Sequence, residues 1–196
     1  MGVPDNDSLA GVLQNLVRCL EGTQVPYLII GGVAQAVIGE PRVTQDVDCI
    51  VAVQIPRGTD ALLHGLEQAG FEVDQAAART RVESAGTFSV TRGRWRVDLI
   101  VASTSFEQSA FQRARRFRLY EVEANLPTPE DLILLKLVPG RDKDLLDVKT
   151  VMIRHRGRLD RAYLEGWAQR LSDEAEDSRI WQTLQRLLRE TDAMTS

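Results

Sequence analysis

Three aspartates stand in segments that otherwise have the apolar pattern of buried strands. Asp46 and Asp48 open "DVDCIV", and Asp98 lies within "RWRVDLIVA". Residues i and i+2 of a strand point to the same face, so Asp46 and Asp48 project together while Val47 and Cys49 point the other way. Two like charges side by side are costly unless a cation lies between them, and oxygen-only ligands suit Mg²⁺ or Mn²⁺. We therefore predict that Asp46 and Asp48 are metal ligands.

The third carboxylate supports this prediction, because the residues that follow Asp98 are strongly apolar. If its strand lies beside that of Asp46 and Asp48, the three carboxylates converge. Such a set can hold two metal ions roughly 3.5 to 4 Å apart around a phosphoryl group that is being displaced. Two simpler interpretations stay open: Asp46 and Asp48 cap a turn at the solvated start of their strand, and Asp98 forms a salt bridge with Arg94 or Arg96.

Two glycines, Gly31 and Gly32, follow the apolar run "YLII" and precede a short helical pattern. Because glycine has no Cβ atom, a phosphate can approach the backbone here, and the free N–H groups of the following helix would point at that anion. A tight turn is the simpler interpretation. The order strand, Gly-Gly, helix, Asp-x-Asp favours phosphate binding.

The elements that must position these residues follow from apolar periodicity. We predict a mixed, twisted β-sheet within about residues 24–126, flanked by helices, and a C-terminal helical part: an α/β (α+β) fold. The catalytic core is expected at 1–126 and the helical region, packed on it, at 127–196. Residues 74–85 form a polar stretch to which no element is assigned. The predicted helices are 8–22, 33–39, 59–68, 130–138, 142–155, 160–170 and 174–190; the predicted strands are 27–30, 47–53, a hairpin across 87–103 and a pair across 115–127.

The composition restricts the class of protein. Lys and Arg total 24 against 28 Asp and Glu, a formal charge of −4, which argues against a protein that coats nucleic acid through bulk charge. Cys19 and Cys49 lack metal-site spacing and are expected to be reduced core residues. No apolar run approaches a membrane span and no signal peptide is evident, so we expect a cytoplasmic location without membrane association.

"IGG", a spacer of thirteen residues and "DVD" resemble the signature of the nucleotidyltransferases of the DNA polymerase beta superfamily. The longer "GGVAQAVIGEPRVTQDVD" resembles the minimal bacterial enzymes of the AbiEii and MenT-like toxin group. In that pattern the third carboxylate falls on Asp98. The group also has a Lys-Leu motif and a later Asp-x-x-Asp, which here give Lys136, Asp144 and Asp147. Pro139 departs from the pattern and is expected to end the lysine helix early.

The resemblance implies a nucleotidyltransferase fold and a reaction. A nucleoside triphosphate would bind with its phosphates at Gly31 and Gly32 and with Mg²⁺ or Mn²⁺, two ions in all, at Asp46 and Asp48. An acceptor hydroxyl would attack the α-phosphorus and release pyrophosphate. Asp98 would be the third metal ligand and the general base.

Further roles concern charged residues near these motifs. The resemblance implies that Lys136 neutralises charge on the triphosphate. Arg42 and Arg141 are candidates for phosphate binding, with plain surface arginines as the alternative. Asp144 and Asp147 share a helix face, and we expect them to support the site by binding Lys or Arg across the domain interface.

The acceptor divides the functional hypotheses. A toxin-antitoxin type enzyme that acts on tRNA or another RNA is the first, because arginines gather beside aromatic residues. Nucleotidylation of a protein partner or of a small molecule such as an antibiotic is the second. A non-catalytic antitoxin or regulator that binds a cognate toxin is the third. The arginines in question are Arg92, Arg94, Arg96, Arg113, Arg115, Arg116 and Arg118, and a solvated strand or helix face is the simpler interpretation of them.

Overall fold

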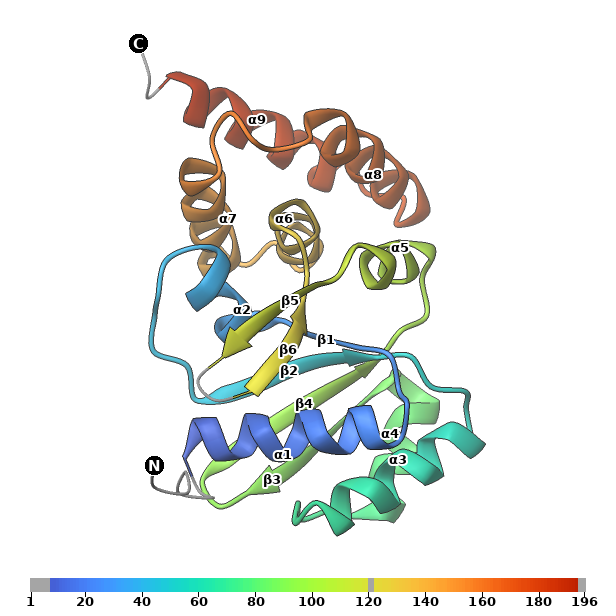
Figure 1. Ribbon diagram of the computed structural model, residues 1–196. Coiled ribbons are helices and arrows are strands. Elements are labelled where there is room, and N and C mark those ends of the chain that lie inside the picture. The colour runs from blue at the N-terminus through green and yellow to red at the C-terminus, as the bar shows by residue number, and fades with distance from the viewer. Residues whose placement is uncertain (1–7, 120–121, 194–196) are drawn as a thin grey trace. The chain divides into compact units, whose positions relative to one another are not determined.

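The computed structural model describes residues 8–119 and 122–193 (Figure 1). Two compact units are present. The first contains Met1–Val33 and Val43–Leu126, and the second contains Ala34–Arg42 and Pro127–Ser196.

A four-stranded mixed sheet forms the centre of the first unit, with strand order β1-β2-β4-β3. Strands β2 and β4 are parallel, and the other two pairings are antiparallel. The predicted α/β class with a mixed sheet is therefore confirmed. The strands are β1 (Tyr27–Ile29), β2 (Asp46–Val51), β3 (Thr87–Arg92) and β4 (Trp95–Val101).

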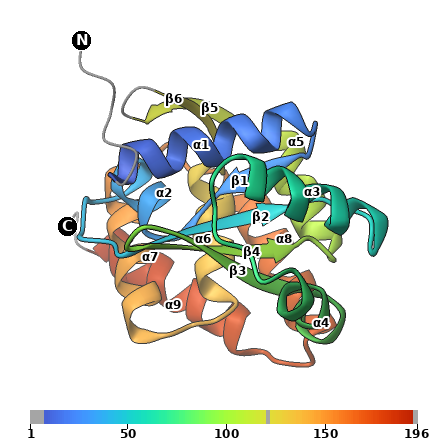
Figure 2. The same cartoon turned by 90° about the horizontal axis from the view of Figure 1, so that it is seen from below.

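A separate two-stranded antiparallel sheet, β5 (Arg115–Leu119) with β6 (Val122–Leu126), confirms the predicted strand pair. The helices of this unit are α1 (Leu9–Gly22), α3 (Arg57–Gln68), α4 (Gln75–Ala85) and α5 (Ser105–Arg113). Helix α1 lies beside α3, and α3 beside α4 (Figure 2). The hydroxyl of Ser8 caps α1 by accepting the N–H of Gly11, as its sequence predicts.

Helix α4 occupies the polar stretch 74–85, to which the sequence analysis assigned no element. Asp74 caps its first turn by accepting the N–H of Ala77, and Gly86 ends it in the left-handed conformation. Only Ala78 and Val82 of this helix are buried. Its apolar face is too narrow to give a clear periodic signal. The capping residues Asp74 and Gly86 are the features of the sequence that indicate this helix.

Helix α2 (Gly31–Ile38) starts in the first unit and ends in the second. The second unit otherwise consists of α6 (Pro129–Leu137), α7 (Asp142–Arg154), α8 (Arg161–Glu174) and α9 (Arg179–Ala193). The predicted break between helices 160–170 and 174–190 was misplaced. Helix α8 continues to Glu174, and the chain turns at Glu176, whose φ is 51°. None of the helices in the described part of the chain combines the length and apolar character that a membrane span requires.

Candidate active site

The parallel pairing of β2 with β4 brings the three predicted carboxylates together. In its register Asp48 lies opposite Asp98, and Asp46 lies opposite Arg96. One carboxylate oxygen from each of Asp46, Asp48 and Asp98 lies within 4.8 Å of the others, and all three residues are half-buried. We call these three residues the acidic triad. It has the convergent geometry that the sequence analysis expected.

Strand alternation explains why these carboxylates share one face. Val47, Cys49, Val97 and Leu99 are each fully buried on the opposite face of the sheet. Burial of these apolar side chains fixes the register, because a slip of one residue would carry the aspartates into the core. The apolar core thus positions the polar site.

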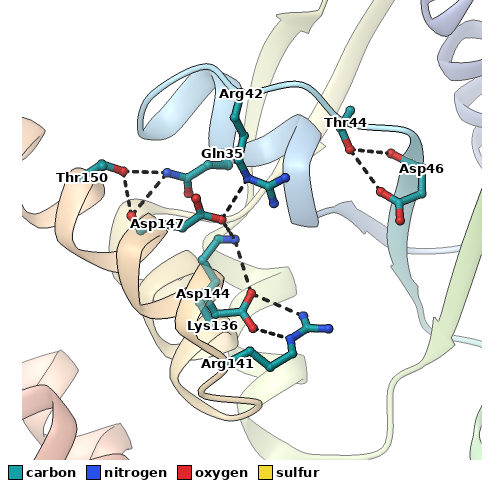
Figure 3. A network of polar contacts seen from close by, with 9 residues as sticks. All are labelled: Gln35, Arg42, Thr44, Asp46, Lys136, Arg141, Asp144, Asp147 and Thr150. Atoms are coloured by element: carbon teal, nitrogen blue, oxygen red, sulfur yellow. Dashed lines mark hydrogen bonds and ion pairs between the residues drawn. The ribbon is translucent and has the colours of Figure 1, made fainter.

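Thr44 orients the carboxylate of Asp46. Its hydroxyl lies 3.1 Å from Oδ1 and 3.0 Å from the backbone oxygen of Asp46 (Figure 3). Thr44 was not among the predicted site residues. Its position two residues before Asp46 could have indicated it, because a threonine hydroxyl often bonds a residue two positions along the chain.

Asp98 has two protein partners. The hydroxyl of Ser89 on β3 donates to Oδ1 at 2.5 Å, and the guanidinium of Arg96 donates to Oδ2 from Nε at 3.0 Å and from a terminal nitrogen at 2.5 Å. The hydrogen bonding of Arg96 to Asp98 and the negative charge of Asp98 raise the pKa of Arg96, with smaller contributions from Asp46 and Asp48. The salt bridge considered as an alternative for Asp98 therefore exists alongside the acidic triad.

Gly31 lies against the acidic triad at the start of α2. Its φ is 61°, and a Cβ atom placed there would lie 1.8 Å from Oδ2 of Asp48. The neighbouring Ile30 N–H donates to the backbone oxygen of Asp48 at 2.9 Å. Glycine is therefore required here by the approach of a carboxylate, a reason that the sequence analysis missed. Gly32 is buried in the first turn of α2.

The remaining predicted site residues form one ion-pair network in the second unit (Figure 3). Lys136 Nζ lies 2.6 Å from Asp147 Oδ2 and 4.0 Å from Asp144 Oδ1. Arg42 pairs with Asp147 at 3.3 Å, and Arg141 pairs with Asp144 at 2.6 Å. Lys136 is only 5% exposed. The three cations predicted to bind phosphate thus all have carboxylate partners within this unit.

Local structure explains the position of Lys136. Helix α6 ends at Leu137, two residues before Pro139, so the lysine lies in the last helical turn. Gln35 extends the network, since its Nε2 donates to Thr150 Oγ1 at 2.8 Å and to the backbone oxygen of Asp147 at 3.3 Å. No sequence pattern indicates Gln35, because its contacts depend on packing between α2 and α7.

Several arginines proposed to contact RNA are engaged within the first unit. Arg116 pairs with Glu21 at 3.0 Å and with Glu123 at 3.6 Å. The guanidinium of Arg94 stacks 5.1 Å from the ring centroid of Trp95. The two carboxylates offset the charge of Arg116, whereas Arg94 keeps its full charge beside the neutral indole ring.

Comparison with known proteins gives one family and several related folds. The model of a family described as "Nucleotidyltransferase of unknown function (DUF6036)" matches residues 8–193. No curated protein matches the chain.

Solved structures of antibiotic-modifying enzymes share the fold. The solution structure of the antibiotic-resistance factor ANT(2'')-Ia has a TM-score of 0.55 at 11% identity, covering 84% of this chain and 94% of that one. The same enzyme in complex with adenylyl-2"-tobramycin gives 0.55 at 14% identity, covering 84% and 97%. The lincosamide antibiotic adenylyltransferase LnuA, lincomycin-bound, gives 0.52 at 13%, covering 74% and 98%. These likenesses confirm the predicted nucleotidyltransferase fold, while membership of the AbiEii and MenT-like group stays a prediction.

Proposed function

The chain belongs to the family of nucleotidyltransferases of unknown function DUF6036, and from this premise we propose that it transfers a nucleoside monophosphate from a nucleoside triphosphate to an acceptor hydroxyl, with divalent ions held by the acidic triad. The convergence of Asp46, Asp48 and Asp98 carries the proposal. The non-catalytic alternative loses weight because all three carboxylates are present and face one another.

The donor set fits Mg²⁺ or Mn²⁺. It consists of carboxylate oxygens alone, half-buried and close enough for shared ligation, and hard cations of this kind take such ligands. We propose two ions, which Asp46, Asp48 and Asp98 would hold. When bound, such ions neutralise the charge that develops on the transferred phosphoryl group.

The chain's own residues perform the other steps. Asp98 accepts the proton of the acceptor hydroxyl, whose oxygen forms a bond to the α-phosphorus while the bond to pyrophosphate breaks. Gly31 and Gly32 bind phosphate through the start of α2. Lys136, Arg42 and Arg141 stay predicted phosphate ligands, and a triphosphate would compete for them with Asp144 and Asp147.

For the acceptor we propose the hydroxyl of a small molecule. Two observations support this choice: the fold is shared with an enzyme solved in complex with adenylyl-2"-tobramycin and with a lincosamide antibiotic adenylyltransferase solved with lincomycin, and Arg116 has intramolecular carboxylate partners. Action on tRNA or another RNA, on a protein, or within a toxin-antitoxin pair would be the contrary outcomes of the following test.

The test is a transfer assay with α-labelled nucleoside triphosphates, Mg²⁺, a panel of hydroxylated antibiotics and a total cell extract. We expect Asp48→Asn to lower the rate at least about 100-fold, because it removes a ligand charge from the reacting centre. Asp60→Asn, which changes an exposed aspartate paired with Arg79, is the matched control and should keep the rate. Transfer by Asp48→Asn near the unmodified rate would refute the metal assignment. Label in RNA or protein instead of a small molecule would refute the acceptor class.

A further inference from the structure

The guanidinium of Arg96 contacts the acidic triad, although the proposed reaction assigns it no role. The guanidinium donates twice to Oδ2 of Asp98, and Ser89 donates to Oδ1, so both oxygens of this carboxylate are engaged by protein groups. Asp98 is at the same time one of the three carboxylates of the acidic triad. A divalent ion and a guanidinium therefore have the same ligand.

The position of Arg96 on β4 explains this overlap. Arg96 and Asp98 are two residues apart on the strand and share a face, and Arg96 lies opposite Asp46 on β2. Its side chain is 61% exposed, whereas that of Asp98 is 16% exposed, so a mostly exposed guanidinium pairs with a mostly buried carboxylate. A guanidinium stays charged in proteins at neutral pH, so this position always presents a positive charge to Asp98.

Electrostatics makes the two cations competitors. Three carboxylates within 4.8 Å repel one another, and one positive charge among them relieves part of that repulsion. A divalent ion would relieve more of the repulsion. However, the guanidinium of Arg96, hydrogen-bonded to Asp98, would repel an ion that binds the same carboxylate. Ion binding at Asp98 is favoured once the guanidinium has moved away.

We propose that Arg96 is the counter-ion of the acidic triad until a divalent ion binds, that the ion displaces its guanidinium from Asp98, and that the released guanidinium then binds the phosphates of the nucleotide. This inference rests on the proposed metal-dependent reaction. Arg96 is a positioning residue in the first state and a phosphate ligand in the second.

Local structure keeps the released group near the reacting phosphate. Trp95 and Val97 on either side of Arg96 are buried on the opposite face of the sheet, which holds the backbone of this position. The side chain therefore stays on the face of the acidic triad, where its exposure leaves it room to turn. A guanidinium offers a planar fork of N–H donors that matches phosphate oxygens, and a triphosphate is the anion delivered to this face.

The test measures two affinities of Arg96→Ala: that for Mn²⁺ alone, by paramagnetic resonance, and that for a non-hydrolysable triphosphate analogue at saturating Mn²⁺. We expect Mn²⁺ to bind about threefold more tightly, the scale of losing one partly exposed competing ion pair. The analogue should bind about tenfold more weakly, because a charge-assisted phosphate contact is lost. The matched control is Arg79→Ala, which breaks the exposed pair with Asp60 and should change neither affinity.

Opposite signs distinguish this role from a structural one, since a damaged site would lose affinity for both ligands. Unchanged or weaker Mn²⁺ binding by Arg96→Ala would overturn the inference, as would unchanged analogue binding. If the alanine variant does not fold, Arg96→Gln keeps the side chain's bulk without its charge and should show the same two shifts. Absence of Mn²⁺ binding by the unmodified protein would contradict the proposed function as well. Normal Mn²⁺ binding that Arg96→Ala fails to tighten would contradict only this inference.

Discussion

At the residue scale, Gly31 shows how closely the backbone approaches the acidic triad. An added Cβ atom would collide with the Asp48 carboxylate, and the left-handed φ of 61° would strain any L side chain. Gly86 has nearly the same φ, 64°, with no atom within 4 Å of an added Cβ. The two glycines thus separate backbone strain from displacement of the carboxylate.

We predict that Gly31→Ala lowers Mn²⁺ affinity at least about tenfold, because Asp48 must move from its ligand position. Gly86→Ala should keep Mn²⁺ affinity. The strained φ should cost each variant about 1–2 kcal/mol of unfolding free energy, and Gly31→Ala should lose more because Asp48 is also displaced. Mn²⁺ titration and urea unfolding of the two variants check this. Equal Mn²⁺ affinity in both would show that the position of Asp48 tolerates the collision and that the site is less constrained than its geometry indicates.

The sequence predicted the acidic triad because two-residue alternation is visible in a single strand, as Asp46 and Asp48 show. It could not predict that Ser89 lies beside Asp98, because that contact depends on the register between β3 and β4. It presented the salt bridge of Asp98 and its metal ligation as alternatives. The same alternation produces both, since it places Arg96 on the face of Asp98.

At the element scale, the contact between α6 and α7 depends on a buried lysine. Among the described cations of its network, Lys136 is almost fully buried, whereas Arg42 and Arg141 are exposed. Asp144 and Asp147 beside the lysine are 3% and 6% exposed. Removal of one partner of a buried ion pair leaves an uncompensated charge. The lysine is therefore needed for packing in the second unit, whatever its role toward phosphate.

Lys136→Met should lower the unfolding free energy by about 3 kcal/mol, the low end for a broken buried pair, because Asp147 loses its nearest cation and keeps only Arg42 at 3.3 Å. Lys149→Met is the control: Lys149 is on α7 and forms an exposed pair with Glu190, whose loss should cost less than about 1 kcal/mol. Urea unfolding followed by circular dichroism measures both. Similar costs for the two variants would mean that Lys136 is not needed for packing and would favour a role reserved for the ligand.

Helices with a wide apolar face were predictable, and α1 is the clearest, with Val12, Leu13, Leu16, Val17 and Leu20 all buried. Helix α5 was missed, although Thr104 and Glu107 form a capping box at its start. Its buried residues are only Phe106 and Ala110. Short helices with few buried residues are defined by their ends and their neighbours more than by periodicity.

At the scale of the whole molecule, both cysteines belong to the unit that holds the acidic triad. Cys19 and Cys49 are free and buried, as predicted, and Cys49 follows Asp48 on β2. Burial raises the pKa of the Cys19 thiol to about 11 and raises that of Cys49 as well, so the reactive thiolate is scarce near pH 8 in the folded unit. Thiol labelling at that pH therefore requires opening of the first unit.

This dependence makes thiol labelling a measure of metal binding that needs no nucleotide. An ion that binds only the folded unit, present at 100 times its Kd, stabilises that unit by about 2.7 kcal/mol. We predict that Mn²⁺ at that excess slows labelling of Cys49 about 100-fold. In Asp48→Asn the protection should largely disappear, since a ligand is lost, whereas Asp60→Asn should keep it. If Mn²⁺ left the labelling rate of the unmodified protein unchanged, the ion would not be binding the folded first unit, and the acidic triad would need an explanation other than metal ligation.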